Sequence, residues 1–426
     1  MKLFKTIISI MTITSVMTTG CNILQKTKVS NVDEIADNNI EKTDEDKENS
    51  VNDDYKYISE YEEERLDLKN YSLDYVFGTD AQTEFIWGRC AKSEKGYYVW
   101  GETERNLCFI DSQTLEMVPL CNRPDCMHND EECNAYFNDF ITGAEEVFYD
   151  KGHIQYYDGY IYIVGSDHEY VNLYKVSVDG STCEEYMSLY RVDLSPNGDY
   201  GDMDTTNVSS YSSPDIWIHR GYVYYIDNRE AYTKIRRMKL GSDKAEIVYE
   251  TGGERPNLYR MLPYGDYLFF QTGNYTDDTI TESDGGIMAY NINTGKIMLV
   301  KKEAISSYGI NNGVLYYYVN SDDVIAFDFN TCKETKICHL ETSSTSDLYG
   351  EKYMYTHSFE NDIVSIYSYD GKMIGMNKDE SIVSCYFGDD KYLLAVYKLS
   401  PTKSVNAIIR VDDIIAGKGK WKLLAW

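Results

Sequence analysis

One repeated unit constrains this chain more than any other feature of its sequence. From about residue 84 to the C-terminus, a turn that contains Gly or Asp is followed again and again by a tyrosine-rich stretch typical of a strand. The copies begin at Gly96, Gly159, Gly221, Asp266, Gly313, Lys352 and Lys391. A spacing of about 40–60 residues is typical of repeats that each form one four-stranded sheet.

Each copy predicts further short strands after the tyrosine-rich one, with polar turns between them and no helical period. In the second copy the strands are expected at 158–163 and 172–178. Such runs form antiparallel sheets, but one four-stranded sheet with aromatic residues on both faces cannot bury itself. Several sheets arranged radially can, so the sequence predicts an all-β fold, a β-propeller with seven four-stranded blades. Six or eight blades are the alternatives, and a pair of β-sandwiches fits the regular repeat less well.

Two units carry a resemblance to a known family. They are Asp-Gly-Tyr-Ile-Tyr at 158–162 and Leu-Tyr-Lys-Val-Ser-Val-Asp-Gly at 173–180. They resemble the low-density-lipoprotein-receptor-like propellers found in lipoproteins of clostridial bacteria, over roughly residues 84–426. The resemblance implies the propeller fold and says little about function.

The N-terminus predicts export and a lipid anchor. Lys2 and Lys5 precede an uncharged, largely apolar run at 6–17, which is too short to span a membrane. Small residues then lead to Gly20 and Cys21, which resembles a bacterial lipobox, although Thr18 replaces the usual leucine. We therefore expect a signal peptide over 1–20, lipidation of Cys21, and a position on the bacterial cell surface, at the outer face of the cytoplasmic membrane. The alternative is an ordinary signal peptide with an incidental cysteine.

Residues 21–69 are expected to form a flexible acidic tether. The segment is rich in Asp, Glu, Asn and Lys and has no sustained apolar period, so it cannot bury enough surface to offset chain entropy. The propeller is then expected over 70–426, closed by the last strand near 420–426 beside residues 71–77. A chain that starts near Tyr71 is expected to keep the thermal transition of the mature protein.

A cysteine- and histidine-rich insert lies at about 119–145. It holds Cys121, Cys126, His128 and Cys133, and four such ligands in a turn-rich loop suit tetrahedral zinc. The family named above carries a similar stretch after its first blade. Disulfide bonds are the competing interpretation in an exported protein, with Cys90 and Cys108 available as partners, and free thiols are the third. With zinc or disulfides, the loop is expected to stabilise the first blade rather than to catalyse.

Acidic loops offer a weaker candidate site. Asp199, Asp202 and Asp204 lie in a glycine-containing loop and supply hard oxygen ligands for Ca²⁺, but the twelve-residue calcium-loop pattern is missing. A second acidic loop contains Asp277, Asp278, Glu282 and Asp284. A solvated acidic loop is the competing interpretation of both.

No catalytic residue is predicted, because neither a Gly-x-Ser-x-Gly elbow nor a sialidase box occurs. The formal net charge of −29 argues against nucleic acid and favours cationic ligands. The 41 tyrosines suit a surface that binds a glycan, a peptide or a protein. We therefore expect a non-enzymatic, lipid-anchored binding or scaffold protein with no cofactor beyond a structural zinc. An extracellular glycan hydrolase or lyase is the alternative.

Overall fold

The computed structural model describes most of the chain from residue 61 onward. The described ranges are 61–68, 89–101, 106–130, 132–137, 153–166, 170–191, 216–227, 233–251, 256–275, 283–302, 305, 308–319, 323–340, 346–358 and 360–425. Within them, no helix is both long enough and apolar enough to cross a membrane.

The described strands form seven antiparallel sheets of four strands, and the chain passes through each sheet in order. Blade 1 consists of β1 (Cys90–Lys92), β2 (Gly96–Trp100), β3 (Leu107–Asp111) and β4 (Met117–Pro119), and blade 2 of β5 (Ile154–Tyr157), β6 (Tyr160–Ser166), β7 (Tyr170–Ser177) and β8 (Cys183–Arg191). Blade 3 consists of β9 (Ile216–His219), β10 (Tyr222–Asp227), β11 (Lys234–Lys239) and β12 (Ala245–Glu250), and blade 4 of β13 (Pro256–Tyr264), β14 (Tyr267–Tyr275), β15 (Ser283–Asn291) and β16 (Ile297–Lys301). Blade 5 consists of β17 (Tyr308–Asn311), β18 (Val314–Val319), β19 (Asp323–Asp328) and β20 (Lys333–His339). Blade 6 consists of β21 (Ser346–Tyr349), β22 (Tyr353–Ser358), β23 (Ile363–Ser368) and β24 (Met373–Lys378). Blade 7 consists of β25 (Ile382–Gly388), β26 (Tyr392–Ser400), β27 (Lys403–Arg410) and β28 (Lys422–Leu424).

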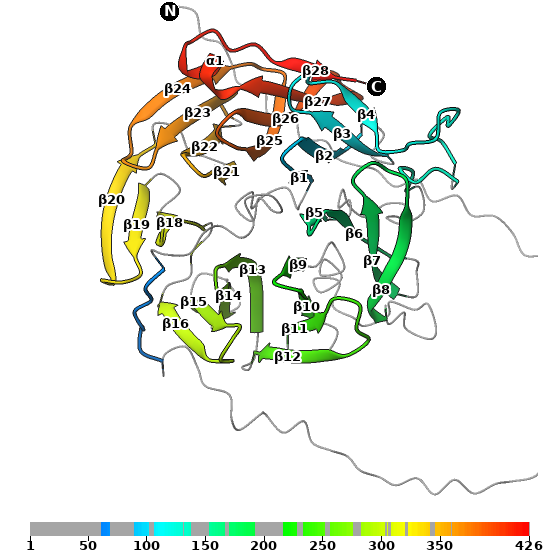
Figure 1. The fold of residues 1–426 in the computed structure, drawn as a ribbon. Helices are drawn as coiled ribbons and strands as arrows, with labels where there is room; N and C mark the ends of the chain where they lie inside the picture. Colours follow the sequence, from blue (N-terminus) through cyan, green and yellow to red (C-terminus); the bar gives the residue numbers. More distant parts are fainter. Residues whose placement is uncertain are drawn as a thin grey trace, which may run out of the picture. The chain divides into compact units, whose positions relative to one another are not determined.

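The seven sheets stand around a centre as the blades of a β-propeller (Figure 1). In each blade the first strand lies nearest the centre and the fourth lies at the rim (Figure 1). A single short helix, α1 (Val411–Ile415), occurs in the described ranges, between β27 and β28. The predicted all-β fold and the predicted number of blades are both confirmed.

The repeated turn residues set the backbone between the first two strands of a blade. At Asp158–Gly159, Arg220–Gly221 and Asn312–Gly313 both turn residues have positive φ, between 47° and 81°. This is the pattern of a two-residue type I′ turn, which matches the twist of the flanking strands and favours glycine at its second position. The repeat noticed in the sequence is therefore a hairpin signal.

The tyrosine-rich second strands are buried on both faces because each blade is covered by two neighbours. In β10, Val223 and Tyr225 pack into a core shared with blade 2, and the Tyr225 hydroxyl donates to the Leu189 carbonyl (3.2 Å). Tyr224, between them, packs into a second core shared with blades 4 and 5. Alternate side chains of one strand thus join consecutive blades, which explains why the strand is apolar or aromatic at nearly every position.

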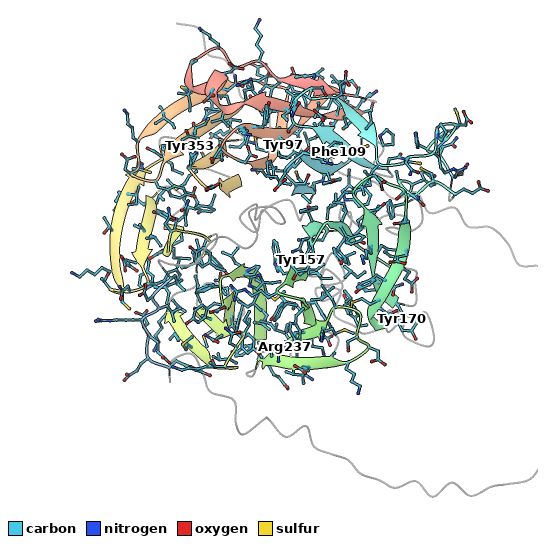
Figure 2. The ribbon with its side chains drawn as sticks, viewed as in Figure 1. Tyr97, Phe109, Tyr157, Tyr170, Arg237 and Tyr353 are labelled. Carbon is cyan, nitrogen blue, oxygen red and sulfur yellow. The ribbon has the colours of Figure 1, made fainter. Side chains whose placement is uncertain are left out.

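The ring closes through side chains between blade 7 and blade 1. Tyr97, labelled in Figure 2, donates to Asp389 Oδ2 (2.8 Å), and Lys92 Nζ lies 2.6 Å from the same oxygen. Asn406 Nδ2 donates to the Trp100 carbonyl (2.7 Å). All four described strands of blade 7 come from the C-terminal end of the chain. The closing residues expected at 71–77 lie outside the described residues.

Residues 61–68 pack against blades 4 and 5, contrary to the expectation of a flexible tether up to residue 69. The Glu64 N–H donates to the Leu299 carbonyl (2.8 Å) and the Leu66 N–H to the Phe329 carbonyl (2.9 Å). Leu66 is 4% exposed and belongs, with its buried neighbour Leu68, to the apolar core shared by blades 3, 4 and 5. The prediction was wrong for this segment because most of its residues are polar, and the residues against which its two leucines pack lie far along the chain.

The neutral imidazole of His153 gives the fold a pH dependence. The ring is buried edge-on against Trp217, with ring centroids 4.9 Å apart, and burial lowers the pKa of His153 to about 4. The unfolded chain binds a proton at this residue near pH 6.5, so it holds more protons than the folded state between about pH 6.5 and pH 4. Stability is therefore lost as the pH falls through this window, by about 3 kcal/mol at pH 4 for this residue.

We expect His153→Gln to remove this part of the acid sensitivity. Urea unfolding of wild type and variant between pH 7 and pH 4 measures the free energy of unfolding of each. The contributions of the many carboxylates are common to both proteins and cancel in the difference between the two. Lys420→Gln is the control, because that position is exposed. Equal pH slopes for wild type and His153→Gln would contradict the assignment.

Candidate functional site

The cysteine insert follows β4 and extends outward from the ring beside blades 1 and 2 (Figure 1). Tight turns fold it: the Cys126 N–H donates to the Arg123 carbonyl (3.3 Å) and the Cys133 N–H to the Asp130 carbonyl (3.0 Å). His128 has a positive φ of 56°, a strained backbone for a histidine. The side chain of Asn106 holds it there by donating to the His128 carbonyl (2.8 Å).

The four predicted ligands converge. The Sγ atoms of Cys121, Cys126 and Cys133 and one ring nitrogen of His128 all lie within 4.8 Å of one another. His128 Nδ1 is 3.3 Å from Cys133 Sγ. Donor atoms on a tetrahedral zinc are separated by about 3.5–3.8 Å, given metal bonds of about 2.0–2.3 Å. The donor set therefore suits a tetrahedral zinc, and the more widely spaced donor atoms would have to approach one another by about 1 Å to bind it.

The pKa values of two of the thiols are shifted in opposite directions by their surroundings. Burial raises the pKa of Cys133 to about 12, although its Sγ accepts a hydrogen bond from the Ala135 N–H (3.4 Å). At Cys126, burial also raises the pKa, but hydrogen bonds from the His128 backbone and the neighbouring thiols outweigh it and lower the pKa overall. A bound divalent cation would stabilise both as thiolates, because a coordinating thiol is deprotonated.

The structure does not bring Cys90 or Cys108 to the insert. Cys90 on β1 and Cys108 on β3 both lie opposite Val99 of β2, which stands between them in the sheet. The two cysteines are therefore two strand spacings apart. Both pack into the core between blades 1 and 7, whereas the insert cysteines pack against the core between blades 1 and 2. No disulfide bond joins any two of the nine described cysteines.

The insert also fastens blade 1 to blade 2. Asn134 Nδ2 donates to the Gly180 carbonyl in the turn between β7 and β8 (2.9 Å). Gly180 has a φ of 69°, and a Cβ there would lie 2.3 Å from the Leu120 carbonyl oxygen, so only glycine fits this approach. The insert therefore lies at the seam between blades 1 and 2, and its structural role stays a prediction.

The remaining predicted site residues lie outside the described residues. They are Cys21 and the acidic residues of the two candidate calcium loops, at 199–204 and 277–282, and the side chain of Asp284 is likewise not described. The calcium and lipidation predictions therefore stay predictions.

A cavity that the sequence did not reveal lies between blades 7 and 1. Its volume is about 600 Å³, and six of its lining residues matter here: Arg89, Trp100, Tyr386, Lys398, Lys403 and Asn406. These residues are spread from position 89 to position 406, so closure of the ring alone brings them together. No motif or spacing could have indicated them.

Comparisons with known proteins find only distant similarities of structure. No model of a protein family matches the chain, and no curated protein matches its sequence. Among solved structures, an oligogalacturonate lyase in complex with manganese is 13% identical over 72% of this chain and 82% of its own, with a TM-score of 0.46. One of two prolyl endopeptidases is 9% identical over 84% of this chain and 51% of its own, also at 0.46. The computationally designed Ika8 protein is 10% identical over 74% and 94%, at 0.41.

Proposed function

We propose that this chain is a lipid-anchored binding protein displayed on a bacterial surface, akin to the clostridial lipoproteins that its repeats resemble. The propeller would present one end of its blades to an extracellular glycan, peptide or protein. No cofactor takes part in binding.

The distribution of connections between strands carries this proposal. Because the strands are antiparallel, the links between first and second strands lie at one end of the blades, and they are short turns such as 158–159 and 312–313. Links between second and third strands and between blades start from the other end and include the long connections 120–153 and 192–215. A rigid scaffold with its long connections at one end is the usual arrangement of a binding surface.

A zinc ion in the insert would complete this scaffold. Cys121, Cys126, His128 and Cys133 would supply all four ligands, which leaves no open position for a substrate. We therefore assign zinc a structural role at the seam of blades 1 and 2, in place of the disulfide alternative.

The lipid anchor gives a direct prediction. Cys21→Ala is expected to release the protein into the medium of its native host, because the lipid on Cys21 would be its attachment to the membrane. Fractionation and metabolic lipid labelling measure this, with Cys183→Ala as a control that keeps the anchor. A Cys21→Ala protein that stays membrane-bound would contradict the anchor.

Glycan and peptide arrays probed with the full-length protein in detergent test the binding function. Retention of one ligand class without chemical change is expected. Cleavage of a bound glycan, detected as new reducing ends or unsaturated products, would instead establish the hydrolase or lyase alternative.

A further inference from the structure

The three thiols of the cysteine insert are not equally accessible to solvent. Cys121 and Cys126 are partly exposed, whereas Cys133 is buried, at 3% exposure. Met127, which directly follows Cys126, is 76% exposed, so the loop is open to solvent beside this thiol. Oxidation of cysteine depends on exposure, and a small water-soluble oxidant therefore reaches Cys126 more readily than Cys133.

The backbone of the insert brings Cys121 and Cys126 close together. The Cys126 N–H donates to the Arg123 carbonyl (3.3 Å), which closes a turn within the segment between the two cysteines. Their Sγ atoms lie within 4.8 Å of each other. A disulfide bond places its sulfur atoms about 2.0 Å apart. Its formation would therefore require a contraction of this short, partly exposed segment and no movement of a blade.

Cys133 is held away from such a reaction by its packing. Its side chain belongs to the apolar core between blades 1 and 2. Its Sγ accepts a hydrogen bond from the Ala135 N–H (3.4 Å) and lies 3.3 Å from His128 Nδ1. Movement of Cys133 toward Cys126 would break these contacts and disturb a close-packed core. The arrangement therefore favours a disulfide bond between Cys121 and Cys126.

We propose that the cysteine insert is a redox-sensitive switch. With its thiols reduced it holds zinc, and a two-electron oxidant such as hydrogen peroxide joins Cys121 to Cys126 and releases the ion. The proposal rests on the zinc site and the binding function proposed above, and it adds a means of regulation to them. Cys133 stays reduced in both states.

The chemistry of this oxidation balances without any further reactant. The sulfur of Cys126 attacks one oxygen of the peroxide, the O–O bond breaks, and water leaves, which gives a sulfenic acid. The sulfur of Cys121 then attacks the sulfur of Cys126, the S–O bond breaks, and a second water leaves. Two thiolates, one hydrogen peroxide and two protons thus give one disulfide and two water molecules.

Loss of these two ligands would loosen the seam between blades 1 and 2. His128 and Cys133 remain as ligands, and a structural zinc needs four. The positive φ of His128, 56°, would then lose the support of the ion. Asn134 lies in the same loop and donates to the Gly180 carbonyl of blade 2 (2.9 Å). The insert begins the long connection 120–153, so its oxidation would change how firmly this connection is held.

Peroxide treatment of the full-length protein, purified in detergent without oxygen, tests the switch. About one zinc per chain is expected to be released, measured with a metal-sensitive dye, together with a loss of about 2 Da from the metal-free chain. Proteolytic cleavage before aspartate places the three thiols on separate fragments, 111–124, 125–129 and 130–138. Mass spectrometry is expected to find fragment 111–124 joined to fragment 125–129. Dithiothreitol and added zinc should restore the starting state.

Two variants separate metal binding from oxidation. Cys126→Ser is expected to lack both the zinc and the disulfide. Cys133→Ser is expected to lack the zinc but still to join Cys121 to Cys126 on treatment. Cys183→Ser is the control, because this cysteine lies outside the ligand cluster, and it should behave as the wild type.

The possible failures can be told apart. Zinc that stays bound in excess peroxide, or a disulfide between Cys126 and Cys133, would overturn the switch and leave the zinc site intact. Wild-type protein that contains no zinc before treatment would overturn the zinc site and the switch together. The binding function is measured separately, on arrays probed with the reduced protein, and does not depend on any of these results.

Discussion

Cys126→Ser is expected to remove the metal and to lower the free energy of unfolding by about 2–5 kcal/mol, the range for loss of a native crosslink. The thiolate would be one of four ligands in a closed site, and its loss releases the loop that joins blades 1 and 2. Elemental analysis of protein purified without oxygen should find about one zinc per wild-type chain and none in the variant. Thermal unfolding measures the loss of stability.

The matched control is Cys183→Ser, at the start of β8. Cys183 is partly buried and packs against the same core but does not belong to the cluster of ligands. It should keep the metal and most of the stability. Absence of metal from the wild type, together with a mass increase only after reduction and alkylation, would show that the cysteines form disulfides instead. Full stability of Cys126→Ser would contradict the structural role itself.

Removal of residues 22–68 is expected to lower the thermal transition strongly, whereas removal of residues 22–58 should leave it unchanged. The first truncation deletes Leu66 and Leu68, which are 4% and 1% exposed, and loss of a buried leucine side chain typically lowers stability by about 2–5 kcal/mol. It also removes the ion pair between Glu64 and Lys296 at the surface of blade 4. Differential scanning calorimetry of the two truncated proteins provides the measurement.

Point substitutions separate packing from chain length in this segment. Leu66→Ala/Leu68→Ala should reproduce most of the loss, and Glu62→Ala, at an exposed position, should reproduce none. Identical transitions for both truncations would show that the segment does not stabilise the propeller and that the tether extends to residue 69 after all.

Much of the fold was accessible from the sequence because its signals are local. Turns such as Asp158–Gly159 adopt their positive φ values through residue type alone, and the tyrosine-rich strand that follows each turn is continuous in the chain. A repeat of this kind predicts one blade, and repetition predicts the ring. The ligand cluster was equally visible, since Cys121 and Cys133 are only twelve positions apart and the turns between them bring the side chains together.

What the tertiary structure alone decided depends on residues far apart in the chain. Glu64 forms an ion pair with Lys296, 232 positions further along the chain. No sequence pattern near residue 64 indicates that Leu66 and Leu68 will pack against blades 4 and 5. The sequence alone allowed Cys90 and Cys108 as disulfide partners of the insert. The strand register places them on β1 and β3, with β2 between them, and in the core on the other side of blade 1. The cavity lined by Trp100 and Asn406 exists only because the ring closes between blades 7 and 1. Local propensities specify each blade, whereas the seams between blades depend on how strand lengths and twists combine around the whole ring.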